Sequence, residues 1–376
     1  MSDTHDDAAS VGRLIQDTAD RLLREQCSKE LVDASEAGEW PEALWRTLVE
    51  TGLPWAAAPE RLGGAGLRLT DALALLRLVG LHAVPVPLAE TLVGAALLGQ
   101  DAAVDTLPQG PLAIALPGTS DSFEARYGSD GWVLEGSIAH VPFAPVAVQL
   151  LVAVAAEDSL ALLRVDPAAC AMDAGRSIAG EPMADVRFDA LQVEPAAATS
   201  LSGWQNLEQL VALMALTRAL MSSGAMQSLL DLSVGYALER KQFGRPIAQF
   251  QAVQQQLAVL AGEAAAAIRA ADGAVEAFEV ALYEASQDPA RMAAAVREAG
   301  VAKARSGEAA GRGAEIAHQV HGAMGFTYEH RLHHRTRRLW AWRDQYGSER
   351  FWQTRLGREL CSAGADALWD ELTRPL

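Results

Sequence analysis

Hydrophobic positions change their spacing twice along the chain, which divides it into three stretches. Between roughly residues 11 and 98 they recur at the spacing of a helix. In the segment 42–51, for example, Leu44, Trp45 and Leu48 would share one face. The pattern therefore predicts a first stretch made of amphipathic helices.

The second stretch, from about Pro111 to Val193, consists of short apolar runs separated by Gly, Asp, Ser and Pro. Turn residues between short runs rich in aliphatic side chains are typical of strands, and this spacing predicts a small antiparallel barrel or sandwich. The expected strands cover Leu112–Leu116, Trp132–Leu134, Val148–Val154, Leu160–Val165 and Val186–Phe188.

Helical spacing returns from Leu201 to the end of the chain. Leu207, Leu210 and Met214 fall on one helix face, and Asp288 followed by a proline predicts a capped helix start. The order of elements indicates the α+β fold class. We expect an N-terminal helical domain over 1–110, a middle antiparallel β domain over 111–198 and a C-terminal four-helix bundle over 199–376.

Composition and charge restrict the classes of partner. The chain has 376 residues, of which 50% are hydrophobic, and a net charge of −17. Such a charge argues against nucleic acid or an anionic membrane, because both favour basic surfaces. We also find no apolar run of about 18 residues, the length of a membrane-spanning helix. The polar, acidic N-terminus is unlike a signal peptide, so we expect a cytoplasmic protein.

Metal and disulfide chemistry are not indicated by the sequence. The cysteines Cys27, Cys170 and Cys361 lie far apart and form no CxxC pair. Histidines also occur without the spacing of metal ligands. We therefore predict no metal site.

Two segments of the C-terminal half are specific. They are Tyr236–Ile247 (YALERKQFGRPI), followed by Phe250 and Gln251, and Gln319–Thr327 (QVHGAMGFT). Both resemble signature segments of acyl-CoA dehydrogenases, and the order helical, strand, helical over nearly the whole chain is also that of this family. The glycine-containing loop Pro59–Gly66 fits the same family more weakly.

The resemblance implies an FAD cofactor and assigns residues to it. Arg240 and Phe243 would meet the FAD of a neighbouring subunit, where a guanidinium forms a rigid fork of hydrogen bonds with the pyrophosphate. Gln251 and Gln319 would donate amide hydrogen bonds, and Gly322 would let the backbone approach closely. The alternative is structural, with Arg240 as a helix-end cation and Phe243 as a core residue.

The residue expected to remove the substrate's α-proton is missing. The family's reaction needs a carboxylate base next to the acyl-CoA carbonyl. Gap-free counting between the second segment and Arg358–Leu360 places that glutamate's position on Tyr346, whose reference pKa of about 10 makes it a poor base. A second position used by some members falls near Met214. Three carboxylates near these two positions would either replace the missing base or be surface charges: Glu208, Asp344 and Glu349.

The middle stretch departs from the family pattern as well. The segment Ala115–Ser122 stands where family members have a longer glycine-rich flavin loop, and Ala139–Pro145 stands where they have a threonine-bearing strand. Pro142 also removes a backbone donor there. Contacts from this chain's middle domain to its own flavin are therefore in doubt.

The residues that would reach a neighbour's FAD are thus present, while those that serve the chain's own site are altered. We expect an FAD-dependent acyl-CoA dehydrogenase that acts on an acyl-CoA thioester, within a tetramer. The chain would be part of a homo-oligomer, or of a hetero-oligomer with a second chain of the same family, as in bacterial members that degrade sterol side chains. Alternatives are a displaced base, Asp344 or Glu349, or a non-catalytic scaffold that only completes a neighbour's site.

The last helix before Tyr346 allows two interpretations. His333 and His334, among several arginines, would approach a CoA or FAD phosphate or belong to a solvated basic face. Likewise Trp340, Trp342 and Trp352 would line an acyl cavity or form core contacts.

Overall fold

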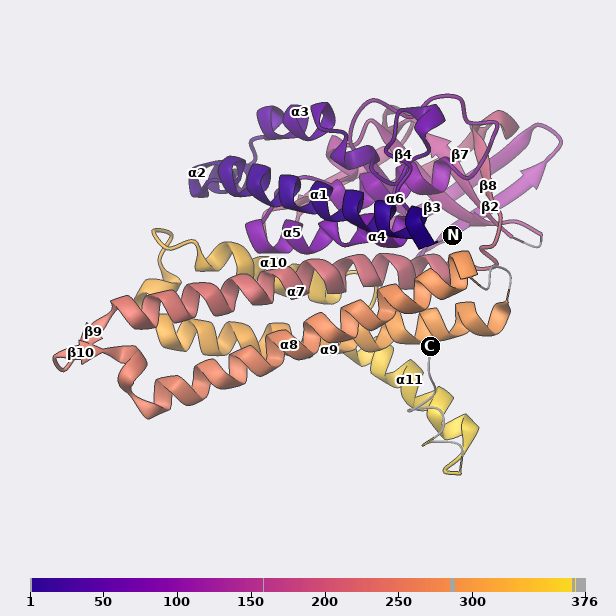
Figure 1. The fold of residues 1–376 in the computed structure, drawn as a ribbon. Helices are drawn as coiled ribbons and strands as arrows, with labels where there is room; N and C mark the ends of the chain where they lie inside the picture. Colours follow the sequence, from indigo (N-terminus) through magenta and orange to yellow (C-terminus); the bar gives the residue numbers. More distant parts are fainter. Residues whose placement is uncertain (1, 158, 285–287, 367–368, 370–376) are drawn as a thin grey trace. The chain divides into compact units, whose positions relative to one another are not determined.

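The computed structural model describes residues 2–157, 159–284, 288–366 and 369 (Figure 1). The chain forms two compact units. Unit 1 comprises Met1–Leu75 and Pro85–Val211, and unit 2 comprises Leu76–Val84 and Ala212–Leu376. The α+β fold class is confirmed, and the three-domain division of the sequence stays a prediction.

The N-terminal part of unit 1 is helical, as expected. Its helices are α1 (Ser2–Gln26), α2 (Lys29–Ala37), α3 (Glu42–Glu50), α4 (Leu69–Leu73) and α6 (Leu88–Leu98), while α5 (Leu75–His82) lies almost wholly in unit 2. The three apolar residues predicted for one face of α3 are buried. Ser28 caps α2 by accepting a hydrogen bond from the backbone N–H of Leu31.

Two four-stranded sheets form the rest of unit 1. One has the order β1-β4-β5-β8 and the other β2-β3-β7-β6. The strands are β1 (Leu112–Ala115), β2 (Phe123–Gly128), β3 (Gly131–Pro142), β4 (Gln149–Ala155), β5 (Leu160–Val165), β6 (Ala171–Arg176), β7 (Pro182–Val193) and β8 (Ala198–Leu201). The β domain is confirmed, except that β1 and β4 pair in parallel, so that their sheet is mixed rather than antiparallel.

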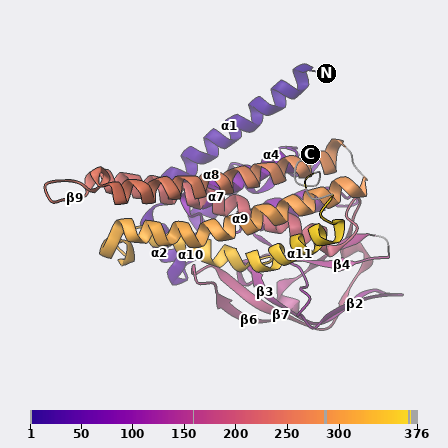
Figure 2. The ribbon, with the colours of Figure 1, turned by 90° about the horizontal axis from the view of Figure 1, so that it is seen from below.

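Unit 2 is built from long helices that lie side by side (Figure 2). They are α7 (Leu207–Glu239), which begins in unit 1, α8 (Gln251–Glu279), α9 (Pro289–His321), α10 (Leu332–Asp344) and α11 (Glu349–Ala363). Asp288 caps α9 as predicted, accepting a hydrogen bond of 2.9 Å from the N–H of Ala290.

Helices α5 and α7 pack at backbone distance because glycines meet there. A Cβ on Gly80 would lie 1.7 Å from the carbonyl oxygen of Met221, and one on Gly224 would lie 1.8 Å from that of Arg77. The Arg77 side chain extends this contact by donating to Ser223 and pairing with Asp272 of α8. The segment 76–84 is thereby fixed to the helices of unit 2.

Helix α7 is long and apolar enough to cross a membrane by length and composition alone, so the sequence prediction that no stretch of that kind occurs is wrong. Inside the protein, 94% of its apolar window is buried. Core helices of globular proteins have the same property, and α7 occupies such a position.

Candidate cofactor-binding and catalytic site

The first family-like segment forms a hairpin at one end of unit 2 (Figures 1 and 2). It consists of β9 (Lys241–Gln242) and β10 (Arg245–Pro246), between α7 and α8. Phe243 is at its turn with φ +51° and 93% of its surface exposed. The core interpretation of Phe243 is therefore wrong in this chain. Arg240 is exposed at the end of α7.

Phe250 packs against two side chains of this hairpin. Its ring meets Phe243 edge to face at 6.2 Å, and the guanidinium of Arg245 lies 4.3 Å above the same ring. Gln251 follows directly as the exposed first residue of α8. Arg245 was not singled out in the sequence, because nothing there shows that it lies over an aromatic ring.

The second family-like segment lies beside the base of the hairpin. The ring of Tyr236 on α7 stacks on His321 on α9, with centroids 4.6 Å apart. This contact brings together two segments that are far apart in the sequence. Gln319 is exposed in the last turn of α9, and Gly322 ends that helix with φ +57° and open space where a Cβ would stand.

This surface of unit 2 fits part of a dinucleotide. A guanidinium and two amides are exposed as hydrogen-bond donors, one aromatic ring is almost fully exposed, and a glycine permits close approach of the backbone. The residues concerned are Arg240, Phe243, Gln251, Gln319 and Gly322. Their role toward FAD stays a prediction.

In the middle domain, two backbone donors of the segment 139–145 already have partners within the chain. The N–H of Ala139 donates to Asp121 at 3.3 Å, and the N–H of His140 donates to Asp185 at 2.7 Å. Asp121 also accepts from the N–H of Gly118 in the shortened loop. The segment that the resemblance aligns with the flavin-contacting strand is thus closed by two carboxylates, and it does not fit a flavin ring.

Tyr346 lies in the loop between α10 and α11. It has φ +55°, which is unfavourable for any residue with a side chain. The buried guanidinium of Arg218 on α7 lies 4.9 Å from the centroid of its ring and donates to Gln345 at 2.5 Å. The carbonyl of Tyr346 accepts a hydrogen bond from the indole of Trp352.

Lys303 on α9 is the second buried cation at this loop. Its surface is 1% exposed, and its Nζ donates to the carbonyls of Arg343 at 2.6 Å and Gly347 at 2.7 Å. Burial lowers the pKa of Lys303 to about 7, with Glu349 partly opposing the shift. The position of the family's carboxylate is therefore surrounded by cationic groups that fix the backbone.

None of the candidate carboxylates takes the place of the missing base within unit 2. Glu349 is held by Arg343, and this hydrogen bond lowers the pKa of Glu349, which weakens it as a base. Asp344 is exposed at the end of α10, and Met214 is buried. Glu208 is exposed near the start of α7 in unit 1.

Sequence reasoning missed Arg218 and Lys303. A signal for Arg218 was present, because it is the single charged residue in the stretch 209–230 of α7. Such an isolated charge, when the surrounding helix is buried, needs partners inside the fold. Lys303 gave no such signal in the mixed sequence of α9.

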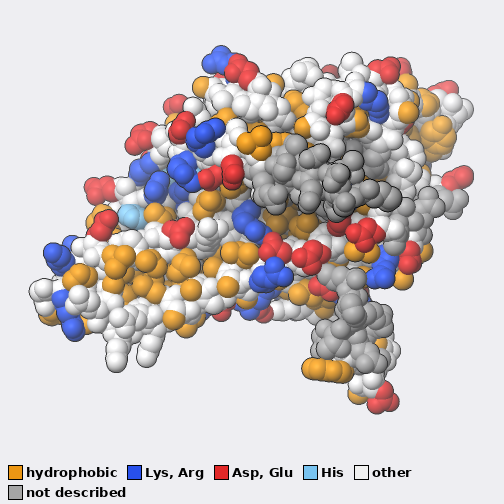
Figure 3. All heavy atoms as spheres, in the orientation of Figure 1, with side chains coloured by type: hydrophobic (Ala, Val, Ile, Leu, Met, Phe, Trp, Pro, Cys, Tyr) orange, Lys and Arg blue, Asp and Glu red, His pale blue; other side chains and the backbone are white. Residues whose placement is uncertain are grey.

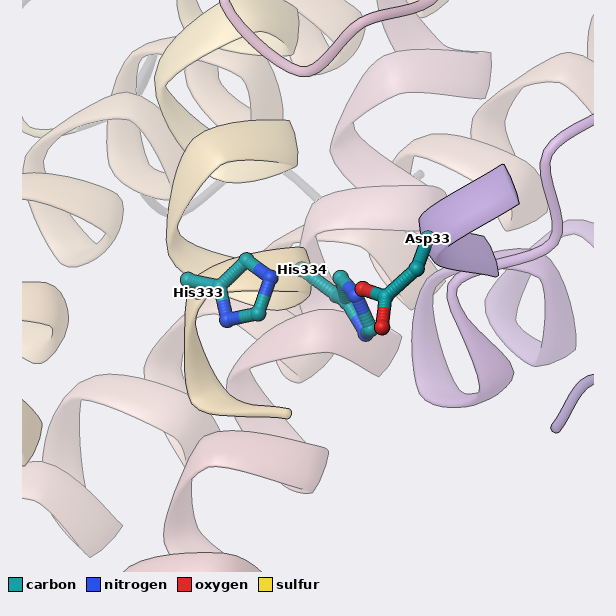
Figure 4. A group of neighbouring side chains, drawn as sticks. All are labelled: Asp33, His333 and His334. Atoms are coloured by element: carbon teal, nitrogen blue, oxygen red, sulfur yellow. The ribbon is translucent and has the colours of Figure 1, made fainter. Parts of the chain in front are cut away.

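The solvated-face interpretation of α10 is wrong for the residues of its first turn. His333 and His334 project from consecutive positions of α10 and are buried, with ring centroids 4.2 Å apart (Figure 4). Arg335 is buried and donates to Ser228 and to the carbonyl of Leu81. Trp342 and Trp352 are core residues, and a Cβ on Gly300 would lie 2.6 Å from the Trp352 ring.

Comparison with known proteins agrees with the fold and the motifs. The model of the acyl-CoA dehydrogenase N-terminal domain matches residues 12–99, and that of the C-terminal domain matches residues 202–347. The chain is 30% identical over 324 residues to acyl-CoA dehydrogenase IpdE2 of Mycolicibacterium smegmatis, covering 84% of this chain and 88% of that protein.

Two solved structures extend the comparison. The ChsE4-ChsE5 complex from Mycobacterium tuberculosis gives a TM-score of 0.82 at 25% identity, covering 94% of this chain and 98% of the matched chain. The Tcur3481-Tcur3483 steroid ACAD, in its G363A variant, gives 0.80 at 27% identity, covering 95% and 99%. The fold and the two segments define a flavoprotein of the acyl-CoA-oxidising class. The chain belongs to the acyl-CoA dehydrogenase family.

Proposed function

We propose that this chain is the subunit without a catalytic base in a heteromeric, FAD-dependent acyl-CoA dehydrogenase. The proposal rests on the residue found where the family's catalytic base is expected, position 346, and on the contacts of its loop. A tyrosine stands there, and Arg218 and Lys303 hold its loop through buried contacts. Of the carboxylates beside this loop in the described part of unit 2, Glu349 is paired with Arg343 and Asp344 is exposed at the end of α10, so neither replaces the missing base.

The chain's contribution is to hold FAD. Arg240 would bind the pyrophosphate, Phe243 would press on the cofactor, and the amides of Gln251 and Gln319 would orient it. When bound, FAD supplies the acceptor for the hydride that leaves the β-carbon of the thioester. Removal of the α-proton and contacts to the flavin ring would come from the partner chain, because Asp121 and Asp185 close the equivalent strand here.

A partner of the same family is supported by two observations. The similar protein of highest TM-score named above is a chain of a complex between ChsE4 and ChsE5. In addition, apolar side chains form an exposed band over α8 (Figure 3). Its residues include Ala252, Ala258, Val259, Ala265 and Ala266, and an apolar band on a helix face is suited to packing against another helix.

The substrate class that we propose is a sterol-derived acyl-CoA thioester. Support comes from the similarity to a protein described as a steroid ACAD.

The experiment compares the chain alone with the chain co-purified with candidate partners of the same family. The chain alone should lack stoichiometric FAD and should not oxidise acyl-CoA, whereas the complex should show a flavin spectrum that bleaches with substrate. Bound FAD and turnover by the chain alone would refute the proposal. A stable complex with FAD but no bleaching by any thioester tested would instead support the scaffold alternative.

A further inference from the structure

The hairpin between α7 and α8 has a backbone conformation that its sequence does not favour. Its two central residues, Phe243 and Gly244, have φ +51° and +81°, and Gln242 pairs with Arg245 on either side of them. Positive φ at both central residues of a two-residue loop is the mark of a type I′ turn, which favours Asn-Gly. Glycine fits the second position, whereas a bulky side chain at the first is a conformational outlier.

Burial does not offset this unfavourable backbone conformation. Phe243 is 93% exposed, the largest fraction of any large hydrophobic side chain among the described residues. A ring that stays in water gains almost none of the free energy that burial of a phenylalanine provides. Residues held in such backbone conformations cluster at functional sites. The fold alone therefore does not explain a phenylalanine at this turn.

The hairpin itself is small. Strands β9 and β10 contribute two residues each and pair with no other strand in the part of the chain that the structure describes. A two-stranded ribbon of this kind is marginally stable without further support. One support is at its base, where the N–H of Ile247 donates to the carbonyl of Arg240 at 2.8 Å. Exchange of the Ile247 amide hydrogen therefore reports how often the hairpin opens.

The ring of Phe250 is a second support. It meets Phe243 edge to face with centroids 6.2 Å apart, and the guanidinium of Arg245 lies 4.3 Å from its centroid. Arg245 is exposed and keeps its hydration while it covers the ring, an arrangement in which a cation–π contact is favourable. Phe250 directly precedes α8, a helix of 29 residues. These contacts therefore link the exposed Phe243 side chain to the helices of unit 2.

We propose that Arg245 and Phe250 are positioning residues, which hold the Phe243 ring outward in its unfavourable turn so that the hairpin is already formed when the partner chain binds. The inference rests on the proposed function, in which Phe243 presses on the cofactor shared with the partner. A recognition element that is ordered beforehand loses less conformational entropy on binding, which raises the affinity. The phenylalanine is then explained by what its exposed ring contacts in the assembly.

The first test is hydrogen exchange of the Ile247 amide in the full chain without a partner. Phe243→Asn and Phe243→Leu both remove the ring, but asparagine adopts positive φ more readily, so the asparagine variant should be protected about two- to tenfold better. Arg245→Gln should lower protection about two- to fivefold, and Arg245→Lys should restore most of it. Lys241→Gln is the matched control, because it removes an exposed cation of the same hairpin and should leave protection unchanged.

The second test is FAD retention by the co-purified complex. Phe250→Leu should lower it about twofold or more, whereas Phe250→Tyr, which keeps the ring, should not. Phe243→Asn should lose FAD although its hairpin is better formed than that of Phe243→Leu, and a purely structural role would not separate these two readouts.

The inference is overturned if the asparagine and leucine variants are equally protected, if Arg245→Gln acts like Lys241→Gln, or if Phe250→Leu retains FAD as well as Phe250→Tyr does. If the unmodified complex holds no FAD, the proposed function fails, while amide exchange in the chain alone still decides whether Arg245 positions the turn.

Discussion

The guanidinium of Arg218 lies 4.9 Å above the ring of Tyr346, the residue that gap-free counting predicts at the position of the family's catalytic carboxylate. A buried cation favours an electron-rich ring and would also favour a carboxylate. A glutamate beside Arg218 and Lys303 would have its pKa lowered by both charges, which is the opposite of what a base near neutral pH needs. The surroundings of Tyr346 therefore agree with the loss of the base.

If Tyr346 takes no part in proton transfer, removing its hydroxyl should not affect the reaction. We expect Tyr346→Phe in the co-purified complex to keep kcat within about twofold, because loss of a general base costs about a hundredfold or more. The measurement is kcat with the acyl-CoA that bleaches the complex. A hundredfold loss would identify Tyr346 as the base.

A displaced base is tested by converting the two remaining candidates to amides. Asp344→Asn and Glu349→Gln should each leave bleaching of the complex by substrate in place. Glu349→Gln should also lower stability by about 1–2 kcal/mol, because Arg343 loses its charged partner. Abolished bleaching in either variant, with normal FAD content, would assign the base to this chain.

Lys303 should contribute to the stability of the Tyr346 loop. Lys303→Met leaves two buried carbonyls without their donor, so the free energy of unfolding should fall by about 2–4 kcal/mol. Lys241→Met is the matched control, since Lys241 is exposed in the hairpin and should change stability by less than about 0.5 kcal/mol. Urea unfolding at pH 7 measures both; equal effects in the two variants would contradict this role.

The same lysine predicts a pH dependence. Its pKa is lowered to about 7 in the folded chain, while the unfolded chain keeps the ordinary value near 10.5. Between these values the unfolded state binds the additional proton, so stability should rise with pH from about 7 to 10, by up to about 1.4 kcal/mol per pH unit from this group. Urea titrations at pH 7.5 and 9 should show a rise that Lys303→Met removes. An equal rise in the variant would contradict the assignment.

His321 at the end of α9 and His330 just before α10 predict that the protein loses stability in acid. Burial lowers the pKa of His321 and brings the pKa of His330 to about 4. Because the unfolded chain takes up protons at a higher pH, stability should fall as the pH drops from about 6.5 toward 4. His330→Asn should reduce this loss by about 1 kcal/mol, after allowance for partial exposure. Thermal unfolding at pH 7 and 5 measures the difference.

Structural features that depend on residues close together in the sequence could be predicted, whereas features that depend on contacts between distant segments could not. The strand Leu160–Val165 and the cap at Asp288 follow from neighbouring residues, and both were predicted correctly. The strands β2 and β6 were missed because most of their side chains are exposed and show no apolar run. These two strands form because they pair with β3 and β7, and their own sequences do not indicate that pairing.

The residues of the candidate site also fall into a group that the sequence predicts and a group that it does not. The motif residues Arg240, Phe243 and Gln319 were identified because they belong to continuous segments. The contact between Tyr236 and His321 that joins those segments, and the cations around Tyr346, depend on packing between distant helices. Burial of Arg218 is a tertiary property, and no periodicity within α7 shows that Gln345 and Tyr346, in the loop between α10 and α11, lie beside it.

The predicted FAD contacts are tested in the hairpin. Arg240→Ala should lower FAD retention in the complex by about ten- to a hundredfold, the effect of losing a charge-assisted hydrogen bond. Phe243→Ala should also lower it without loss of stability, since the ring is 93% exposed. Arg312→Ala is the control, because Arg312 is an exposed cation of α9 paired with Glu315. Unchanged FAD content in Arg240→Ala would remove this hairpin from the cofactor site.

The central claim is that this chain holds part of a partner's FAD and none of its own. The most direct measurement is the FAD content of the purified complex, from flavin absorbance and the ratio of the two chains. We expect a single FAD for each pair of unlike chains and no stoichiometric flavin on this chain alone. One FAD on every chain, or a flavin-loaded and active assembly of this chain by itself, would contradict it.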